Sequence, residues 1–139
     1  MELTRVTRVK PIDSFSARWD SIVERDSHSS ISNARESVKV VVVGGGAGGV
    51  ELALAMQYRL KQLFREAGRD PDMVAVEIVS RGDVVLSSHN RRVQKVFKRV
   101  LSERKVKVHT GKEVVDVKDP PAGVADGSGT LVCSDGTEV

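Results

Sequence analysis

The sequence predicts an α/β fold in which a parallel βαβ sheet carries an antiparallel β-meander and follows an N-terminal helix. Two valine-rich segments of strand length, residues 40–43 and 73–79, flank a helical pattern over residues 47–67. Toward the C-terminus, short β-type segments are joined by Gly, Pro and Asp turns, which is typical of antiparallel strands. We therefore expect one α/β domain over residues 37–139 and a separate N-terminal segment over residues 1–36.

The N-terminal segment is expected to hold a short strand, a helix and a linker. Residues 6–9 are the expected strand, Pro11 ends it, and Asp13 or Ser14 caps the helix. Residues 27–33 are polar and form the linker. The apolar residues of this helix recur at helical spacing and are expected to pack on a neighbouring surface: Ile12, Phe15, Trp19, Ile22 and Val23.

A glycine-rich turn separates the first strand of the domain from its first long helix. The valines at 40–43 are typical of a strand buried on both faces. After them, a Gly-x-Gly-x-x-Gly pattern falls on Gly44, Gly46 and Gly49, and helix-forming residues follow at once. Strand, glycine turn and helix in this order are the setting of the dinucleotide-binding fingerprint of Rossmann-like folds.

Each glycine of the fingerprint has a physical role. Gly44 permits the tight turn, Gly46 lets the backbone approach a pyrophosphate, and Gly49 lets helix and strand pack closely. The helix N-terminus then offers unpaired N–H groups to the phosphates. A mononucleotide phosphate loop is excluded, because Gly49 is followed by Val50 and Glu51 where that loop requires Lys and Ser or Thr. A glycine turn that binds nothing remains the simpler alternative.

The end of the second strand bears on which nicotinamide cofactor binds. NAD-specific sites usually carry an acidic residue there, which accepts hydrogen bonds from the adenosine ribose. Here the strand ends in Ser80 and Arg81, while Glu77 comes three residues too early and Asp83 follows in the loop. A hydroxyl beside a guanidinium favours the 2′-phosphate of NADPH. The alternative is that Arg81 is a solvated loop residue and NADH binds through Ser80 and the backbone.

The second half of the domain is predicted as a helix, a third parallel strand and the meander. The helix spans residues 90–103, the strand 105–109, and the meander 113–117, 130–133 and 138–139. Asp135-Gly136 is a hairpin signal, and residues 120–129 are expected to form a mobile loop. The helix turns Val93, Phe97 and Val100 or Leu101 inward. Its outer face is basic and is expected to be solvated: Arg91, Arg92, Lys95, Lys98 and Arg99.

Composition excludes several classes of function. The net charge of +3 is spread among interleaved acids and bases, so no nucleic-acid partner is expected. No apolar run is long enough to span a membrane. Cys133 is the single cysteine, so it is expected in the core, and the protein in the cytoplasm or another reducing compartment. His28, His89 and His109 are scattered, so no catalytic residue and no metal site is predicted.

Four stretches together resemble one family: residues 39–56, the SRGD loop at 80–83, VKVHTGKEVVDV at 106–117 and the closing DGTEV. They are similar to the NAD(P)H-binding domain of FAD-dependent pyridine nucleotide–disulfide oxidoreductases, and nearest to type II NADH dehydrogenase-like proteins. Residues 9–25, VKPIDSFSARWDSIVER, look like the flavoprotein module fused to selenide, water dikinase.

The resemblance implies that a second, FAD-binding domain is split around this one and that hydride passes from nicotinamide to flavin. It implies that Glu51 lies near the nicotinamide end and the flavin; the simpler alternative is a first-turn carboxylate favoured by the helix dipole. The expected cofactor-binding residues are Gly44, Gly45, Gly46, Ala47, Gly48, Gly49, Glu51, Ser80 and Arg81.

The sequence departs from the family in three places. It lacks an FAD fingerprint before residue 37, an Ala-Thr-Gly strand after Val139 and a redox cysteine pair, which in the family lies in the FAD part. We therefore expect a domain truncated before its last strand, whose partner is the FAD-binding domain of the same protein. A homo-oligomer is possible, and the isolated chain should be inactive. The alternative is a non-catalytic nucleotide-binding or regulatory module of a fused enzyme such as selenide, water dikinase.

Overall fold

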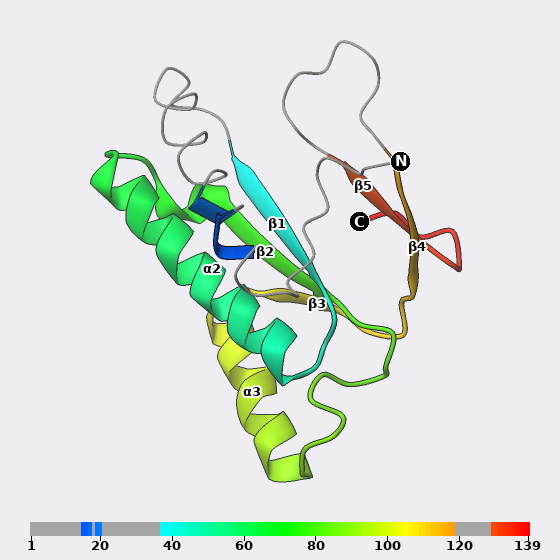
Figure 1. Cartoon of the computed structure of the whole chain (residues 1–139). Coiled ribbons are helices and arrows are strands. Elements are labelled where there is room, and N and C mark those ends of the chain that lie inside the picture. The colour runs from blue at the N-terminus through cyan, green and yellow to red at the C-terminus, as the bar shows by residue number, and fades with distance from the viewer. Residues whose placement is uncertain (1–14, 18, 21–36, 119–128) are drawn as a thin grey trace.

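The computed structural model describes residues 15–17, 19–20, 37–118 and 129–139, and it confirms the predicted α/β fold (Figure 1). A parallel sheet, two helices on one of its faces and an antiparallel strand pair make up the described domain. Its elements in chain order are β1 (Val38–Val43), α2 (Ala47–Glu66), the 3₁₀ turn η1 (Pro71–Met73), β2 (Val74–Val79), α3 (Arg91–Glu103), β3 (Lys107–His109), β4 (Val114–Lys118) and β5 (Thr130–Cys133).

The parallel sheet has the order β1-β2-β3. β1 runs beside β2 in register from Val38↔Val74 to Val43↔Val79, and β2 pairs with β3 from Glu77↔Lys107 onward. The expectation that β1 is buried on both faces is wrong, because β1 lies at the edge of the described sheet and Val43 is 56% exposed. The central strand β2 is instead the buried one, with one exposed residue in six.

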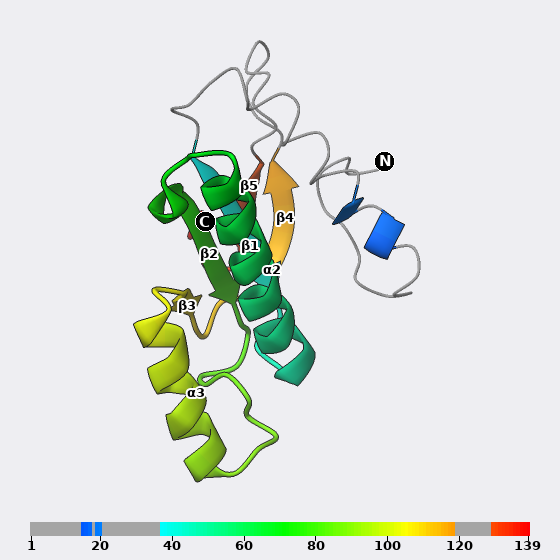
Figure 2. The same ribbon diagram turned by 90° about the vertical axis from the view of Figure 1, so that its left-hand side faces the viewer.

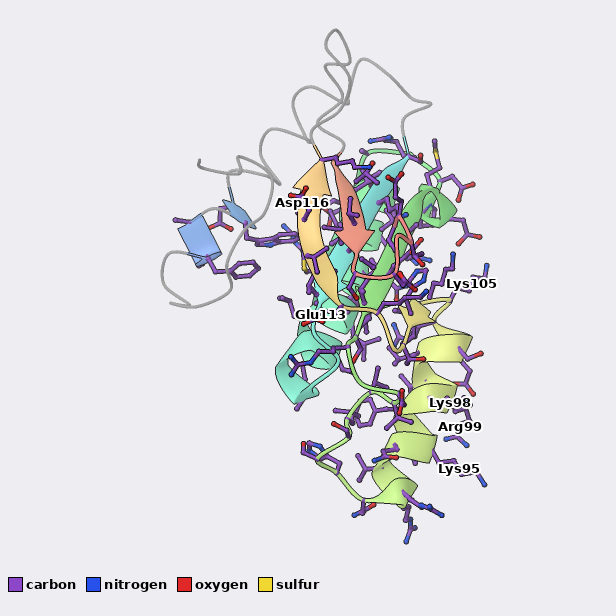
Figure 3. The ribbon with its side chains drawn as sticks, turned by 90° about the vertical axis from the view of Figure 1, so that its right-hand side faces the viewer. Lys95, Lys98, Arg99, Lys105, Glu113 and Asp116 are labelled. Carbon is purple, nitrogen blue, oxygen red and sulfur yellow. The ribbon has the colours of Figure 1, made fainter. Side chains whose placement is uncertain are left out.

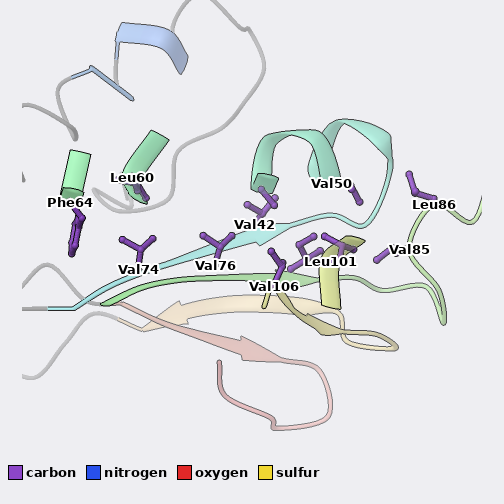
Figure 4. Packing of buried hydrophobic residues seen from close by; sticks show 12 residues of the cluster. Val42, Val50, Leu60, Phe64, Val74, Val76, Val85, Leu86, Leu101 and Val106 are labelled. Atoms are coloured by element: carbon purple, nitrogen blue, oxygen red, sulfur yellow. The ribbon is translucent and has the colours of Figure 1, made fainter. Parts of the chain in front are cut away.

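The hydrophobic core lies between the sheet and its two helices (Figure 4). The buried residues of α2 recur at helical spacing: Val50, Ala53, Gln57, Leu60 and Phe64. The Gln57 Nε2 donates a 2.7 Å hydrogen bond to the carbonyl of Arg104, so this buried amide ties α2 to the end of α3. The four largest of the fully buried side chains are Ile78, Leu101, Val50 and Val76.

Helix α3 begins where the sequence predicts, because the Asn90 side chain accepts a hydrogen bond from the Val93 N–H. Leu101 is its buried residue, and the predicted outer basic side chains are all exposed. The third strand is shorter than expected. Lys105 has a φ of +57° and belongs to the turn that ends the helix, so β3 starts only at Lys107.

The antiparallel pair β4 and β5 lies on the side of the sheet away from the helices, as Figures 1 and 2 show in perpendicular views. The predicted meander is confirmed by the pairing of Val114 with Cys133, and by a bridge between Val132 and Glu138 beyond the Asp135-Gly136 turn. Cys133 is 2% exposed, as expected for a core position.

The N-terminal helix is confirmed only in part. Residues 15–17 and 19–20 are helical, and Trp19 packs against the core cluster, as predicted for this apolar face. The expected strand at 6–9, the linker at 27–33 and most of the loop at 120–129 lie outside the described residues. Among the described helices, none is both long and apolar enough to cross a bilayer.

Candidate dinucleotide-binding site

The glycine turn joins β1 to α2 at the carboxyl edge of the parallel sheet. Gly44 has a φ of +126°, a conformation that side-chain-bearing residues rarely adopt, and its N–H donates to the carbonyl of Val79 at 2.8 Å. The chain then extends through Gly46 and enters the helix, where the Val50 N–H donates to the Gly46 carbonyl at 3.0 Å. The turn is thus fastened to the end of β2 as well as to its own helix.

The glycines of the turn divide into close-packed and open positions. A Cβ on Gly49 would lie 2.0 Å from the carbonyl oxygen of Gly44, and one on Gly45 would lie 2.4 Å from the Ser80 Oγ. A Cβ on Gly46 or Gly48 would meet no atom within 4 Å. Gly45 and Gly49 therefore lack side chains because the fold needs the space, whereas nothing in the described chain fills the space at Gly46 and Gly48.

The N-terminus of α2 is open toward this space. Gly46 is its N-cap, with no side chain accepting from the first N–H groups, and the first turn holds no acidic residue. Exposed N–H groups at the positive end of a 20-residue helix favour an anion. The first-turn interpretation of Glu51 is wrong, because Glu51 is the fifth helical residue and its side chain is exposed.

The loop after β2 lies against the glycine turn. Ser80 is 6% exposed and faces Gly45, so its hydroxyl is directed toward the turn. The side chain of Arg81 is 83% exposed, and its Nη1 lies 3.8 Å from the Glu113 Oε1. The structure therefore brings the predicted residues of the turn and Ser80 together, and it leaves Arg81 at the rim in an exposed ion pair.

Leu86 is a part of this site that the sequence analysis missed. Its φ is +57°, its side chain is 3% exposed, and its N–H donates to the Gly45 carbonyl at 2.7 Å. A positive φ at a branched residue is costly and persists only where surrounding contacts enforce it. The apolar run Val84-Val85-Leu86 in an otherwise polar loop was the available signal, since such a run predicts a buried loop segment.

His109 makes a contact that the sequence pattern did not indicate. In the described chain its Nε2 lies 2.5 Å from the Glu77 Oε2, and the Lys39 Nζ lies 3.4 Å from the other oxygen of Glu77. Burial raises the pKa of Glu77, but the His109 hydrogen bond and the Lys39 charge outweigh it and leave the pKa below its usual value. No three metal-ligating side chains gather among the described residues.

The chain matches one protein family over nearly its whole length. The match is to the pyridine nucleotide-disulphide oxidoreductase family, and it covers residues 7–139. The chain belongs to this family. This match confirms the resemblance to pyridine nucleotide–disulfide oxidoreductases that the sequence showed. No curated protein sequence matches the chain.

The fold of the chain is similar to that of parts of several solved structures. The chain is similar to a ferredoxin reductase from Rhodopseudomonas palustris, with a TM-score of 0.58, 17% identity, and coverage of 86% of this chain and 24% of that one. It is also similar to a water-forming NADH oxidase from Lactobacillus brevis bound to NADH, with a TM-score of 0.54, 18% identity, and coverage of 80% and 21%. An engineered NADPH oxidase made from that enzyme, bound to NADPH, gives the same values. At these identities the likeness shows the fold alone, and the chain spans under a quarter of each structure.

The close contact at Gly49 makes a testable prediction for the family turn. Gly49→Ala places a methyl group against the Gly44 carbonyl, and this clash outweighs the gain of about 1 kcal/mol in helix propensity. We expect the free energy of unfolding, measured by urea denaturation, to fall by about 1–3 kcal/mol. Gly48→Ala is the matched control, because its methyl group meets open space and should leave stability equal or higher. Equal losses for both variants would contradict the prediction.

A second prediction concerns the Glu77–His109 pair. Because the folded state lowers the pKa of Glu77, its ionised form stabilises the fold above the usual value of 4.5, and this contribution is lost as the pH falls through the folded-state pKa. Urea denaturation from pH 7 to pH 3 should therefore show a steeper loss of unfolding free energy for wild type than for Glu77→Gln. The control is Glu66→Gln, an exposed carboxylate of α2. If the unfolding free energies of wild type and Glu77→Gln fall in parallel as the pH is lowered, this loss of stability does not come from Glu77.

Proposed function

We propose that this chain is the NAD(P)H-binding part of an FAD-dependent oxidoreductase and holds the dinucleotide for hydride transfer to FAD. The observation that carries the proposal is the open, uncapped N-terminus of α2 behind a fingerprint glycine turn, in a chain that belongs to this family. Carboxyl edges of parallel sheets are where such ligands bind. The redox chemistry belongs to the two cofactors, and the chain supplies binding and orientation.

The glycine turn fits the pyrophosphate by both shape and charge. The N–H groups at Gly46, Ala47 and Gly48 would hold the phosphates, because these positions are the first of the helix and the two glycines leave room for close approach. Gly44, Gly45 and Gly49 would shape the turn itself. Glu51, exposed one turn further along α2, is assigned to the nicotinamide end by the family resemblance.

The FAD is proposed to bind mainly to a part of the protein that lies outside this chain. The similar structures are about four to five times longer than the matched region, which supports a larger protein with further domains. Within the family, we place the chain among type II NADH dehydrogenase-like proteins, near the flavoprotein module fused to selenide, water dikinase. A flavin-free preparation of the chain should then oxidise no NADH or NADPH with quinone or dye acceptors.

The alternative function is a non-catalytic nucleotide-binding module of a fused enzyme. The family match favours the oxidoreductase, and none of the comparisons supports the module. Flavin content separates the two, because an oxidoreductase of this family must take up FAD. A full-length gene product that purifies without FAD and cannot be loaded with it would favour the module.

Gly46→Val tests the position of the site. A Cβ at Gly46 meets no atom of the described chain within 4 Å, so the new side chain should fill the space over the helix N-terminus and abolish binding while the fold is kept. We expect titration with NADH and NADPH, followed by nicotinamide fluorescence, to show at least a tenfold weaker affinity for both. Ala55→Val, which adds similar bulk at an exposed position two turns along α2, should bind as wild type does. If Gly46→Val binds both cofactors with unchanged affinity, the glycine turn is not part of the binding site.

Arg81→Ala tests the proposed preference for NADPH. A charge-assisted pair between Arg81 and the 2′-phosphate is worth about 1.5–3 kcal/mol, so its loss should weaken NADPH binding about ten- to a hundredfold and leave NADH nearly unchanged. The engineered NADPH oxidase follows the same logic, since its five substitutions remove one aspartate and add two arginines. Arg92→Ala on α3 is the control. Tighter NADH binding that Arg81→Ala does not alter would establish NADH as the cofactor.

A further inference from the structure

The loops that follow β2 and β3 are joined to each other by backbone hydrogen bonds beyond the strands. The Ser80 N–H donates to the His109 carbonyl at 2.8 Å, and the Lys112 N–H donates to the Ser80 carbonyl at 2.9 Å. A third bond runs from the Gly111 N–H to the Gly82 carbonyl at 3.0 Å. These bonds hold the residues after β3 beside the residues that end β2, where the adenosine ribose of a dinucleotide lies.

Glu113 is the acidic residue that this arrangement brings to Arg81. Its own backbone is fixed on the other side as well, because the Ser134 N–H donates to the Glu113 carbonyl at 2.8 Å. Lys112, the neighbouring cation, is already bound by Asp135 and by the Thr137 hydroxyl, so it does not neutralise Glu113. The Glu113 carboxylate thus lies 3.8 Å from the Arg81 guanidinium. Figure 3 shows Glu113 where the chain enters β4.

We propose that Glu113 is a specificity-determining residue that competes with the cofactor for Arg81; this inference rests on the proposed function. NADH presents a neutral ribose, so Arg81 can stay paired with Glu113 while NADH binds. NADPH must draw the guanidinium away from Glu113 to form the pair with its 2′-phosphate. Glu113 therefore weakens NADPH binding and leaves NADH binding unaffected. The affinity of the chain for NADPH then exceeds its affinity for NADH by a smaller factor.

The size of the effect follows from the exposure of the pair. The side chains of Arg81 and Glu113 are 83% and 53% exposed, and exposed ion pairs of this kind change an equilibrium by about two- to fivefold. Asp83 is the other acid of these loops, and its Oδ1 lies 3.9 Å from the position of a Cβ on Gly111. Asp83 has no ion pair with Arg81 within 4.0 Å, so the competition is assigned to Glu113.

The experiment measures dissociation constants of NADH and NADPH for the 139-residue chain and for Glu113→Gln. We expect Glu113→Gln to bind NADPH about two- to fivefold more tightly and NADH with unchanged affinity. Asp116→Asn is the matched control, because Asp116 is an exposed acid of β4 that accepts a hydrogen bond from its neighbour Val117, whereas the ion pair of Arg81 is with Glu113. Figure 3 shows Asp116 further along β4 than Glu113. Asp116→Asn should change neither affinity.

The double variant Arg81→Ala with Glu113→Gln tests the mechanism. If Glu113 acts by holding Arg81, the gain in NADPH affinity from Glu113→Gln should disappear when Arg81 is alanine. Where Arg81 is present, 0.5 M salt should reduce the gain. A ratio of NADPH to NADH affinity that Glu113→Gln leaves unchanged would overturn the inference, as would a gain that persists without Arg81. Failure of the proposed function is distinct, since the wild-type chain would then bind neither cofactor.

Discussion

The contact between Gly49 and the Gly44 carbonyl is the constraint on which the rest of the site depends. Helix α2 can start this close to β1 only because residue 49 has no side chain. That closeness buries Val50 and Ala53, which are 1% and 0% exposed, directly behind the turn. It also directs the first N–H groups of α2 to the edge where β1 and β2 end. A helix displaced outward by one methyl group would lose both the packing and the direction of these N–H groups.

The central strand β2 connects this constraint to the loops at the rim. Its two faces differ in chemistry, because Val76 and Ile78 face the helices while Glu77 lies on the other face with His109 and Lys39. A shift of one residue in the register between β2 and β3 would turn His109 to the helical side and leave the buried Glu77 carboxylate with fewer partners. The pair therefore favours the one register that also places the loop after β3 beside Ser80.

Local patterns predicted the parts of this structure that local physics determines. The strand, glycine turn and helix from Val38 to Glu66 were predictable because backbone propensity, glycine placement and helical periodicity agree within one continuous segment. The ion pair of Arg81 with Glu113 and that of Glu77 with His109 each join residues 32 positions apart in the sequence. Such pairs depend on which residues of neighbouring strands, and of the loops that follow them, lie opposite each other, and no local pattern contains that information. The left-handed Leu86 is likewise enforced by its contact with Gly45.

In the proposed site, the group that both nicotinamide cofactors share and the group that distinguishes them meet different parts of the structure. The pyrophosphate is common to both, and the turn proposed to bind it is held by close backbone contacts that tolerate no added atom at Gly49. The proposed discrimination lies with Arg81 and Glu113, two exposed side chains on hydrogen-bonded loops, where a substitution disturbs no buried group. Because an exposed pair contributes about 0–1 kcal/mol, its charge can change without endangering a fold of ordinary stability. Under the proposed function, cofactor preference can therefore vary at these two residues while the glycine turn stays unchanged.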